Sequence, residues 1–423
     1  MSIHCMLRNI AQALRRALHL LARPVRSDRG RGGIVIHPYR GYGSPKEVFL
    51  MGRVFRQRRR VSKAGEATLR RDLIDIARRL LRRGIAGAVL SVHFGGKEQQ
   101  VMTDRDGYFR IHLQPMQPPP ADRLWHHMDL KSVEPAGAVT KGDLFIPPNT
   151  ARYVVISDID DTIMYTGVAN KVKMLWRLFI QGPQSRVVFP GVAAFYRALH
   201  SGAAGAECNP MLYVSRGPWS LYEILDEFFH LHGIPVGPIL FLRDWGLTPK
   251  HPFPRQRKGH KLALIRDMLA LYHDQPFILI GDNGQRDPEI YAQVVQEHPG
   301  RVLAVYIRNV SHNQKRHREI EILAKKVVNA GSTLLLAADS FAMAEHAVKH
   351  GLIAPEAVSE VLKEREHQQG DLDLKPTRKV KRLTSQDTQK ALARGKLKET
   401  LGKKNRKESP PNVVVESEDR KRH

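Results

Sequence analysis

From about residue 151 onward, short apolar segments alternate with helical ones, and this order constrains the fold more than any other feature. The apolar segments are RYVVIS, MLYVS, PILFL, FILIGD and VLAVYI, beginning at residues 152, 211, 238, 277 and 302. Longer stretches with helical spacing lie between them, such as PWSLYEILDEFFHLHG and KGHKLALIRDMLALYH. Short strands joined by helical crossovers predict an α/β fold with a doubly wound parallel sheet.

The first predicted strand runs directly into three aspartates within four residues, in the stretch SDIDDT. Burying such a cluster without a cation is costly, because the carboxylates repel one another. Carboxylates two positions apart on an extended segment leave on the same side, so Asp158 and Asp160 can share one site. This spacing predicts a nucleophile and a general acid–base acting at phosphorus, with Mg²⁺ between the oxygens. The alternative is an acidic turn that is solvated or binds calcium.

Polar residues also follow the later strands, where the active site of an open α/β sheet lies. Taken singly, each has an ordinary explanation as a helix cap or a surface residue. Their occurrence in order on successive strands of one sheet predicts a metal-assisted phosphoryl-transfer site. The candidates are Ser215, Arg216, Arg243, Lys261, Asp282 and Asp287.

The rest of the chain divides into three further parts. Residues 1–30 have an apolar helical stripe interrupted by arginines, which fits a helix in a membrane interface or one packed on the next domain. Residues 31–150 contain short, partly alternating runs separated by Gly, Asp and Pro, which predict a small β-sandwich-like domain, with a basic helix over 70–84. The runs are GIVIHPYRGYG, EVFLMGRVFR, AGAVLSVHFGG, QQVMTDRDGYFRIHL and GDLFIPP. The catalytic domain then spans 151–360, and a basic disordered tail follows over 365–423.

Net charge and cysteine content limit the partners and the compartment. The chain has 68 Lys and Arg against 42 Asp and Glu, so its net charge of +26 favours nucleic acid, an acidic membrane surface or phosphorylated substrates. The segment 375–423 alone has 16 Lys and Arg and 6 Asp and Glu, a net +10. This tail is solvated, or it contacts nucleic acid or anionic lipid.

Two cysteines exclude a disulfide framework and a Cys-based zinc site, and no apolar run is long enough for a transmembrane segment. We therefore expect a cytoplasmic protein, with peripheral membrane association as the alternative to a freely soluble one. The oligomeric state stays open.

The motifs together resemble the haloacid dehalogenase (HAD) superfamily. DIDDT is similar to its first motif, the end of the Ser215 strand to its second, Lys261 to its third, and GDNGQRD to its fourth. More narrowly, SDIDDTIMYTGV, YVSRGPWSLY, GPILFLRDWG and IGDNGQRDPEIY resemble the catalytic domain of the actin-patch-protein phosphatidate phosphatases and their bacterial relatives. This resemblance covers about residues 150–355 and implies a HAD-like sheet with a short cap.

The resemblance also implies a role for each motif. The first aspartate, Asp158, would become an aspartyl-phosphate, and Asp160 would protonate the leaving alkoxide and then activate water. Ser215 would hold a phosphoryl oxygen, and Lys261 would offset negative charge. Mg²⁺ would be bound by Asp158, Asp282, Asp287 and the backbone carbonyl of Asp160. The expected substrate contacts are Thr162, Arg216 and Arg243.

The substrate expected from the resemblance is phosphatidate, which would be hydrolysed to diacylglycerol. The segment between Gly167 and Pro190 is too short for a large cap domain, so the site would be open to a phosphate fixed on a membrane or macromolecule. Its stretch KVKMLWRLFI fits a bilayer interface or a flap helix over the sheet. The alternatives are a phosphatase acting on nucleic-acid ends or phosphoproteins, and a non-catalytic scaffold that binds membrane or nucleic acid.

Overall fold

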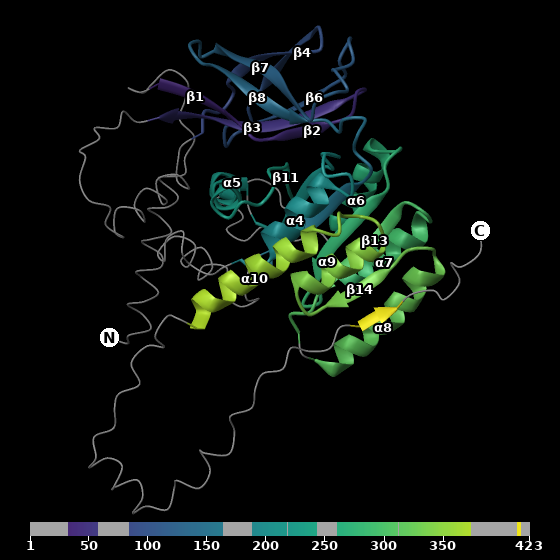
Figure 1. The fold of residues 1–423 in the computed structure, drawn as a ribbon. Helices are drawn as coiled ribbons and strands as arrows, with labels where there is room; N and C mark the ends of the chain where they lie inside the picture. The colour runs from purple at the N-terminus through teal and green to yellow at the C-terminus, as the bar shows by residue number, and fades with distance from the viewer. Residues whose placement is uncertain are drawn as a thin grey trace, which may run out of the picture.

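The computed structural model describes residues 33–57, 84–163, 188–217, 219–242, 260–311, 313–373 and 413–415. Within this part, a β-sheet domain lies against one end of an α/β domain (Figure 1). The predicted helix over residues 1–30, the basic helix around 70–83 and the stretch KVKMLWRLFI lie outside the described residues. No helix in the described part is long and apolar enough to cross a membrane.

The β domain is one continuous sheet around a single apolar core. Its strands follow the order β1-β3-β2-β8-β7-β4-β5, and β6 pairs with β3. The sheet folds over on itself, so that β4 and β7 lie above β2 and β3 (Figure 1). The strands are β1 (Gly33–Pro38), β2 (Gly41–Gly43), β3 (Val48–Gln57), β4 (Val89–Phe94), β5 (Lys97–Met102), β6 (Tyr108–Leu113), β7 (Trp125–Glu134) and β8 (Val139–Phe145).

The strand β7 is absent from the sequence prediction, although its side chains alternate between buried and exposed. Two of its inward residues, His126 and Ser132, are polar, and both are buried. Their hydrogen bonds run to backbone carbonyls, from Ser132 Oγ to Pro135 O at 2.6 Å and between His126 Nε2 and Arg123 O at 3.2 Å. Polar residues satisfied in this way interrupt the apolar pattern that would otherwise predict a strand.

The α/β domain confirms the predicted parallel sheet. Its strands follow the order β11-β10-β9-β12-β13-β14, all parallel, and β15 pairs antiparallel with β14 at one edge. The five predicted strands correspond to β9 (Val154–Asp158), β10 (Met211–Ser215), β11 (Ile239–Phe241), β12 (Phe277–Asp282) and β13 (Val302–Arg308). The remaining strands are β14 (Leu334–Ala337) and β15 (Val413–Val415).

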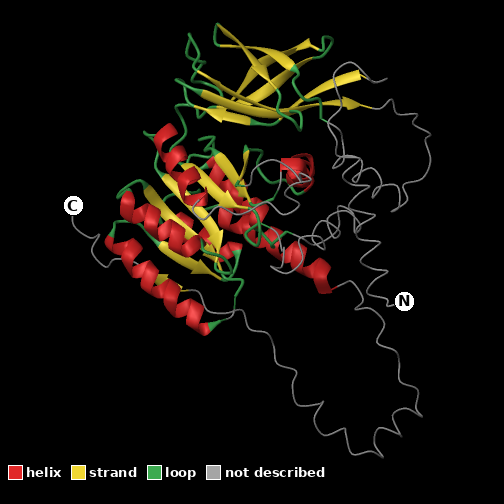
Figure 2. Cartoon of the chain, turned by 180° about the vertical axis from the view of Figure 1, so that it is seen from behind, coloured by secondary structure: helices red, strands yellow, loops and turns green. Residues whose placement is uncertain are grey.

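Helices cover both faces of this sheet (Figure 2). One apolar core contains α4, α5, α9 and the side chain of Val361 from α10, and the other contains α6, α7 and α8. Successive residues of β9 alternate between the two cores, with Val155 in the first and Val154 and Ile156 in the second, because side chains of a strand point to opposite faces. The helices are α4 (Val192–Ser201), α5 (Tyr222–Leu231), α6 (His260–Leu271), α7 (Asp287–Glu297), α8 (Gln314–Asn329), α9 (Ser340–Lys349) and α10 (Ala357–Asp373).

The predicted start of a disordered tail at residue 365 is wrong, because α10 continues without interruption to Asp373. Its polar side chains bind the backbone at the start of α4: Gly191 N donates to Gln368 Oε1 at 3.0 Å and Ala194 N to Glu364 Oε1 at 3.2 Å. These contacts satisfy N–H groups that a helix leaves unpaired at its first turn. Within the predicted tail, β15 adds a short strand to the edge of the α/β sheet, beside α8 in Figure 1.

An aromatic stack joins the β domain to the α/β domain. Tyr39 stacks on Tyr222 with ring centroids 4.0 Å apart, and on Trp219 at 5.7 Å with the planes only 6° from parallel. The neighbouring Arg40 donates its backbone N–H to the Tyr222 hydroxyl at 2.7 Å and pairs its guanidinium with Asp226. Stacked aromatic rings contribute more to stability than the area that they bury. This contact therefore stabilises the packing of the β domain on the α/β domain.

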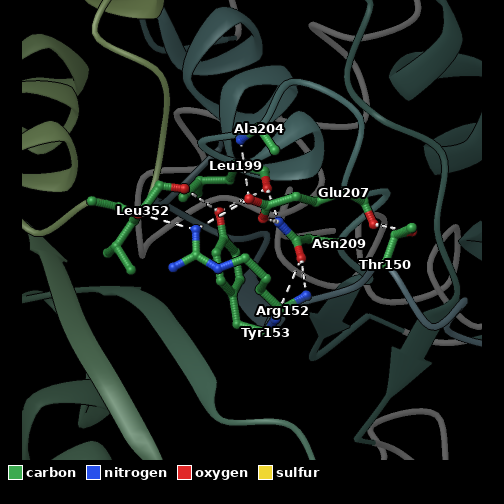
Figure 3. Close-up of polar contacts among 9 residues, drawn as sticks. Thr150, Arg152, Tyr153, Leu199, Ala204, Glu207, Asn209 and Leu352 are labelled. Carbon is green, nitrogen blue, oxygen red and sulfur yellow. Dashed lines mark hydrogen bonds and ion pairs between the residues drawn. The ribbon is translucent and has the colours of Figure 1, made fainter.

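A buried amide anchors the linker between the two domains (Figure 3). Asn209, which precedes β10, accepts hydrogen bonds from Arg152 N at 2.8 Å and Tyr153 N at 3.3 Å. Its Nδ2 donates to Leu199 O at 3.0 Å and to Glu207 Oε2 at 2.7 Å. Both atoms of this fully buried amide are therefore used twice, which is the full capacity of an asparagine side chain.

We expect Asn209→Ala to lower the free energy of unfolding by about 2–4 kcal/mol, because it leaves several buried groups without partners. The strand-end site predicted from the sequence should be unaffected in the fraction that is folded, since the amide lies before β10 and that site follows it. Denaturant unfolding monitored by circular dichroism measures the first quantity. Thr150→Ala is the matched control: it removes one hydrogen bond, to Glu207 O at 3.0 Å, and should cost about 1 kcal/mol. An equal loss in both variants would contradict the role of Asn209.

Candidate active site

The candidate site lies where the strand order of the sheet reverses. From β9 the chain proceeds to β10 and β11 on one side, and it then returns to β12 on the other side of β9. In open α/β sheets, ligands bind at such a switch point, outside the carboxyl ends of the strands. Asp158 is the last residue of β9 and Asp282 the last residue of β12, so the fold itself brings these two carboxylates together.

A buried lysine bridges two of the aspartates. Lys261, in the first turn of α6, donates to Asp158 Oδ1 at 2.8 Å and to Asp287 Oδ1 at 2.7 Å. The side chain of Lys261 is only 4% exposed, and both carboxylates are fully buried. Burial disfavours the ammonium, but the two carboxylates outweigh it and raise the pKa of Lys261 well above its ordinary value. The lysine therefore stays charged.

Burial and mutual repulsion raise the pKa of both strand-end carboxyls. The pKa of Asp158 is raised to about 7, mainly by burial and further by Asp287 and Asp160, although Lys261 opposes the shift. The pKa of Asp282 is raised to about 8, again mainly by burial and then by Asp287 and Asp158. One lysine does not offset the burial and repulsion of these carboxylates, and a further cation would favour their ionised forms.

The geometry of the carboxylates fits a divalent cation. Among the described residues, Asp158, Asp282 and Asp287 form a group whose ligand oxygens lie within 4.8 Å of one another. Asp158 Oδ2 and Asp282 Oδ2 are buried without a hydrogen-bond partner. Buried carboxylate oxygens without partners are costly unless a cation takes them up, and oxygen ligands of this kind suit Mg²⁺.

A glycine makes room for one member of the group. A Cβ at Gly281 would collide with the Asp287 carboxylate, so only glycine lets that side chain reach back over the end of β12. The same carboxylate accepts a hydrogen bond from Asp282 N at 3.3 Å. Asp287 is therefore held by the backbone of the strand end as well as by Lys261.

The segment after Asp158 is held by contacts to its backbone. Asp160 O accepts a hydrogen bond from Gln285 Nε2 at 3.2 Å, and Thr162 O accepts one from the buried Arg308 at 2.9 Å. Asp161 has a positive φ of 61°, a conformation that turns the chain sharply after the strand. Both Asp160 and Thr162 are buried, and the hydroxyl of Thr162 has no hydrogen-bond partner.

The predicted second motif lies on the strand next to Asp158. Val214 is the register partner of Asp158, and Ser215 follows it at the end of β10. Ser215 Oγ accepts a hydrogen bond from Gly217 N at 3.0 Å, so its own proton remains available to donate. Arg216 is half-buried at the same strand end. Arg243 lies outside the described residues.

Two residues near the site were not predicted to act there. Gln285 lies within the quoted stretch GDNGQRD but had no role of its own, and Arg316 lies in a polar, basic run at the start of α8. The first could be suspected from its place between Asp282 and Asp287. Nothing in the sequence distinguishes Arg316 from a solvated surface arginine, because the contacts that place it beside the site are to backbone carbonyls distant in the sequence.

The fold and the site define an α/β domain with an acidic, lysine-bridged centre at the carboxyl ends of parallel strands. Residues 153–309 match the family model "Phosphatidate phosphatase APP1, catalytic domain". The chain is 33% identical to the phosphatidate phosphatase APP1 of Saccharomyces cerevisiae over 160 residues, which are 38% of this chain and 26% of the yeast protein. Residues 153–309 are thus similar to the catalytic domain of a phosphatidate phosphatase, which supports a phosphatase enzyme.

Two further comparisons add less. An uncharacterized protein of Schizosaccharomyces pombe is 29% identical over 159 residues, covering 37% of this chain and 25% of that protein. The chain thus spans about a quarter of the length of the curated relatives it matches. A solved carbohydrate acetylesterase from Xanthomonas citri has a TM-score of 0.23 at 10% identity, over 68% of this chain and 72% of that one, and this likeness carries no argument.

Proposed function

We propose that this protein is a Mg²⁺-dependent phosphatase that hydrolyses a phosphomonoester through an aspartyl-phosphate, with phosphatidate as its substrate and diacylglycerol as its product. One observation carries the proposal: Lys261 bridges Asp158 and Asp287, while Asp158 and Asp282 keep buried, unpartnered oxygens. The HAD-like mechanism implied by the sequence motifs fits this arrangement.

In the first half-reaction, a carboxylate oxygen of Asp158 attacks phosphorus. A bond forms between this oxygen and phosphorus, and the bond between phosphorus and the ester oxygen breaks. Asp160, two residues further along, gives its proton to the leaving alkoxide. In the second half-reaction, Asp160 takes a proton from water, the water oxygen bonds to phosphorus, and inorganic phosphate leaves Asp158.

The other residues hold the phosphoryl group and its charge. Lys261 offsets negative charge at Asp158, and the Ser215 hydroxyl donates to a phosphoryl oxygen. Thr162 and Arg216 are proposed to contact the substrate, as is Arg243. Asp158, Asp282 and Asp287, with the carbonyl of Asp160, would hold Mg²⁺, which supplies positive charge for the phosphoryl oxygens when bound.

Phosphatidate is proposed because a phosphatidate phosphatase is the named relative of the matched segment. The net charge of +26 supports a substrate at an anionic surface, since basic proteins concentrate near acidic lipid. We further propose that the protein is cytoplasmic and binds membranes peripherally. The basic tail, which would mediate lipid or nucleic-acid binding, lies mostly outside the described residues.

A substrate panel tests the proposal. Purified full-length protein with Mg²⁺ should release phosphate from phosphatidate in anionic vesicles at least about ten times faster than from nucleotides, 5′-phosphorylated oligonucleotides or phosphopeptides, because an enzyme discriminates between substrates by its kcat/KM for each. EDTA should abolish release, and excess Mg²⁺ should restore it. Faster release from oligonucleotides or phosphopeptides would replace the lipid by that substrate class. If no phosphate is released from any of these substrates or from an aryl phosphate, the proposed phosphatase activity is refuted.

A further inference from the structure

The loop between Asp282 and Asp287 is held by a residue from a distant helix. Arg316, in the first turn of α8, donates from Nε to Asn283 O at 3.0 Å and from Nη2 to Gln285 O at 2.7 Å. Both carbonyls belong to the four-residue loop that connects the two candidate metal ligands. A single guanidinium therefore fixes the backbone of this loop at two points.

The guanidinium is itself held in a fixed orientation. Its Nη2 donates to Glu289 Oε2 at 3.0 Å, its Nη1 pairs with the other oxygen of Glu289, and Nη1 also lies 3.3 Å from Glu319 Oε2. The side chain of Arg316 is only 16% exposed. A planar group with five N–H donors can span these partners at once, whereas a lysine ammonium offers a single nitrogen.

The loop held by Arg316 also contacts the segment after β9, which contains Asp160. The backbone of Gln285 is held by Arg316, and its side-chain amide donates to Asp160 O at 3.2 Å. On its other side, Asn283 Oδ1 accepts from Val310 N and Ser311 N, each at 2.8 Å. The loop between the two aspartates thus has one preferred position, set by contacts outside the site.

We propose that Arg316 is a positioning residue that sets the Mg²⁺ affinity of the site by holding the loop 283–286 and, through Gln285, the carbonyl of Asp160. The inference rests on the proposed function, because it assigns the metal to the same carboxylates. Groups that orient metal ligands without touching the ion typically account for a 10–100-fold change in metal affinity when they are removed.

The test is a titration of the full-length protein with Mg²⁺ near pH 8. Binding is measured by calorimetry and, separately, by the rise in unfolding temperature. Arg316→Ala should raise the Mg²⁺ concentration at the midpoint by about 10–100-fold. Arg316→Lys should not restore it, because the ammonium cannot span both carbonyls and Glu289. The same shift should appear in the Mg²⁺ dependence of phosphate release, and saturating Mg²⁺ should recover kcat.

Arg266→Ala is the matched control. Arg266 also makes a bidentate ion pair, with Glu297 at 2.9 and 2.6 Å, but it touches no carbonyl of the loop. Its removal should leave the Mg²⁺ midpoint within about twofold of the wild type.

A lower unfolding temperature with an unchanged midpoint would show a purely structural role for Arg316 and overturn the inference. If Arg316→Ala does not fold, Arg316→Lys and Gln285→Ala carry the same test. A wild type that binds Mg²⁺ but releases no phosphate would overturn the proposed function alone, because the Mg²⁺ midpoints would still decide the role of Arg316.

Discussion

Asp158→Asn should reduce phosphate release by at least about 10³-fold, because an amide replaces the carboxylate proposed to attack phosphorus. The protein should remain folded, since asparagine has the same shape and the buried Lys261 keeps its second carboxylate, Asp287. Phosphate release under saturating Mg²⁺ measures the loss, and thermal unfolding checks the fold. In the wild type, acid quenching during turnover should trap a phosphorylated peptide that contains Asp158.

Asp267→Asn provides the control for this substitution. Asp267 lies on the exposed side of α6, the helix that carries Lys261, so the same chemical change there should leave turnover within about twofold. Turnover of Asp158→Asn at the wild-type level would remove the nucleophile from the proposal. So would a trapped phosphate on a peptide without Asp158.

Mg²⁺ should stabilise the protein much more at pH 8.5 than at pH 5.5. The pKa of Asp158 is raised to about 7 and that of Asp282 to about 8, mainly by burial, whereas an aspartate in the unfolded chain titrates near 3.9. Between these values the folded protein binds protons that the unfolded chain has lost. Without metal, stability from these two groups is therefore complete below about pH 4 and is lost as the pH rises through about 7 to 8.

Mg²⁺ competes with these protons, so its affinity should rise over the same pH range. A ligand present at about 100 times its dissociation constant adds about 2.7 kcal/mol to the free energy of unfolding. For a domain of about 150–250 residues this corresponds to a rise in Tm of about 5–10 °C. Thermal unfolding with and without Mg²⁺ at the two pH values measures the effect. Asp282→Asn, which lacks one of the titrating carboxyls, should reduce both the Mg²⁺ shift and its pH dependence. Equal Mg²⁺ shifts at the two pH values in the wild type would contradict the linkage.

Much of the catalytic domain was predictable, because its strands are short apolar runs between helical stretches. Each of the five predicted strands is present, and Asp158, Lys261, Asp282 and Asp287 converge as their places at strand ends and helix starts predicted. This worked because the connection order of a parallel sheet brings the carboxyl ends of its strands to one edge.

What the sequence could not predict depends on contacts between distant polar groups. Arg316 is held by hydrogen bonds to backbone carbonyls 31 and 33 residues away. No local sequence pattern predicts such long-range contacts. The start of the tail was predicted too early, at residue 365 within α10, for a similar reason. A polar, charged segment predicts a tail unless its carboxyl and amide groups are known to bind the start of another helix. The strand β7 was hidden by its buried polar residues.

Tyr39 of the β domain stacks on Trp219 and Tyr222 of the catalytic domain. These two residues follow Ser215 closely in the sequence. Excising the catalytic domain for biochemical work would therefore expose two aromatic rings to water beside the strand end that carries Ser215. Kinetic constants from such a fragment would describe a catalytic domain in which the segment after Ser215 has lost its contact with Tyr39. The shortest useful fragment for assays begins before β1.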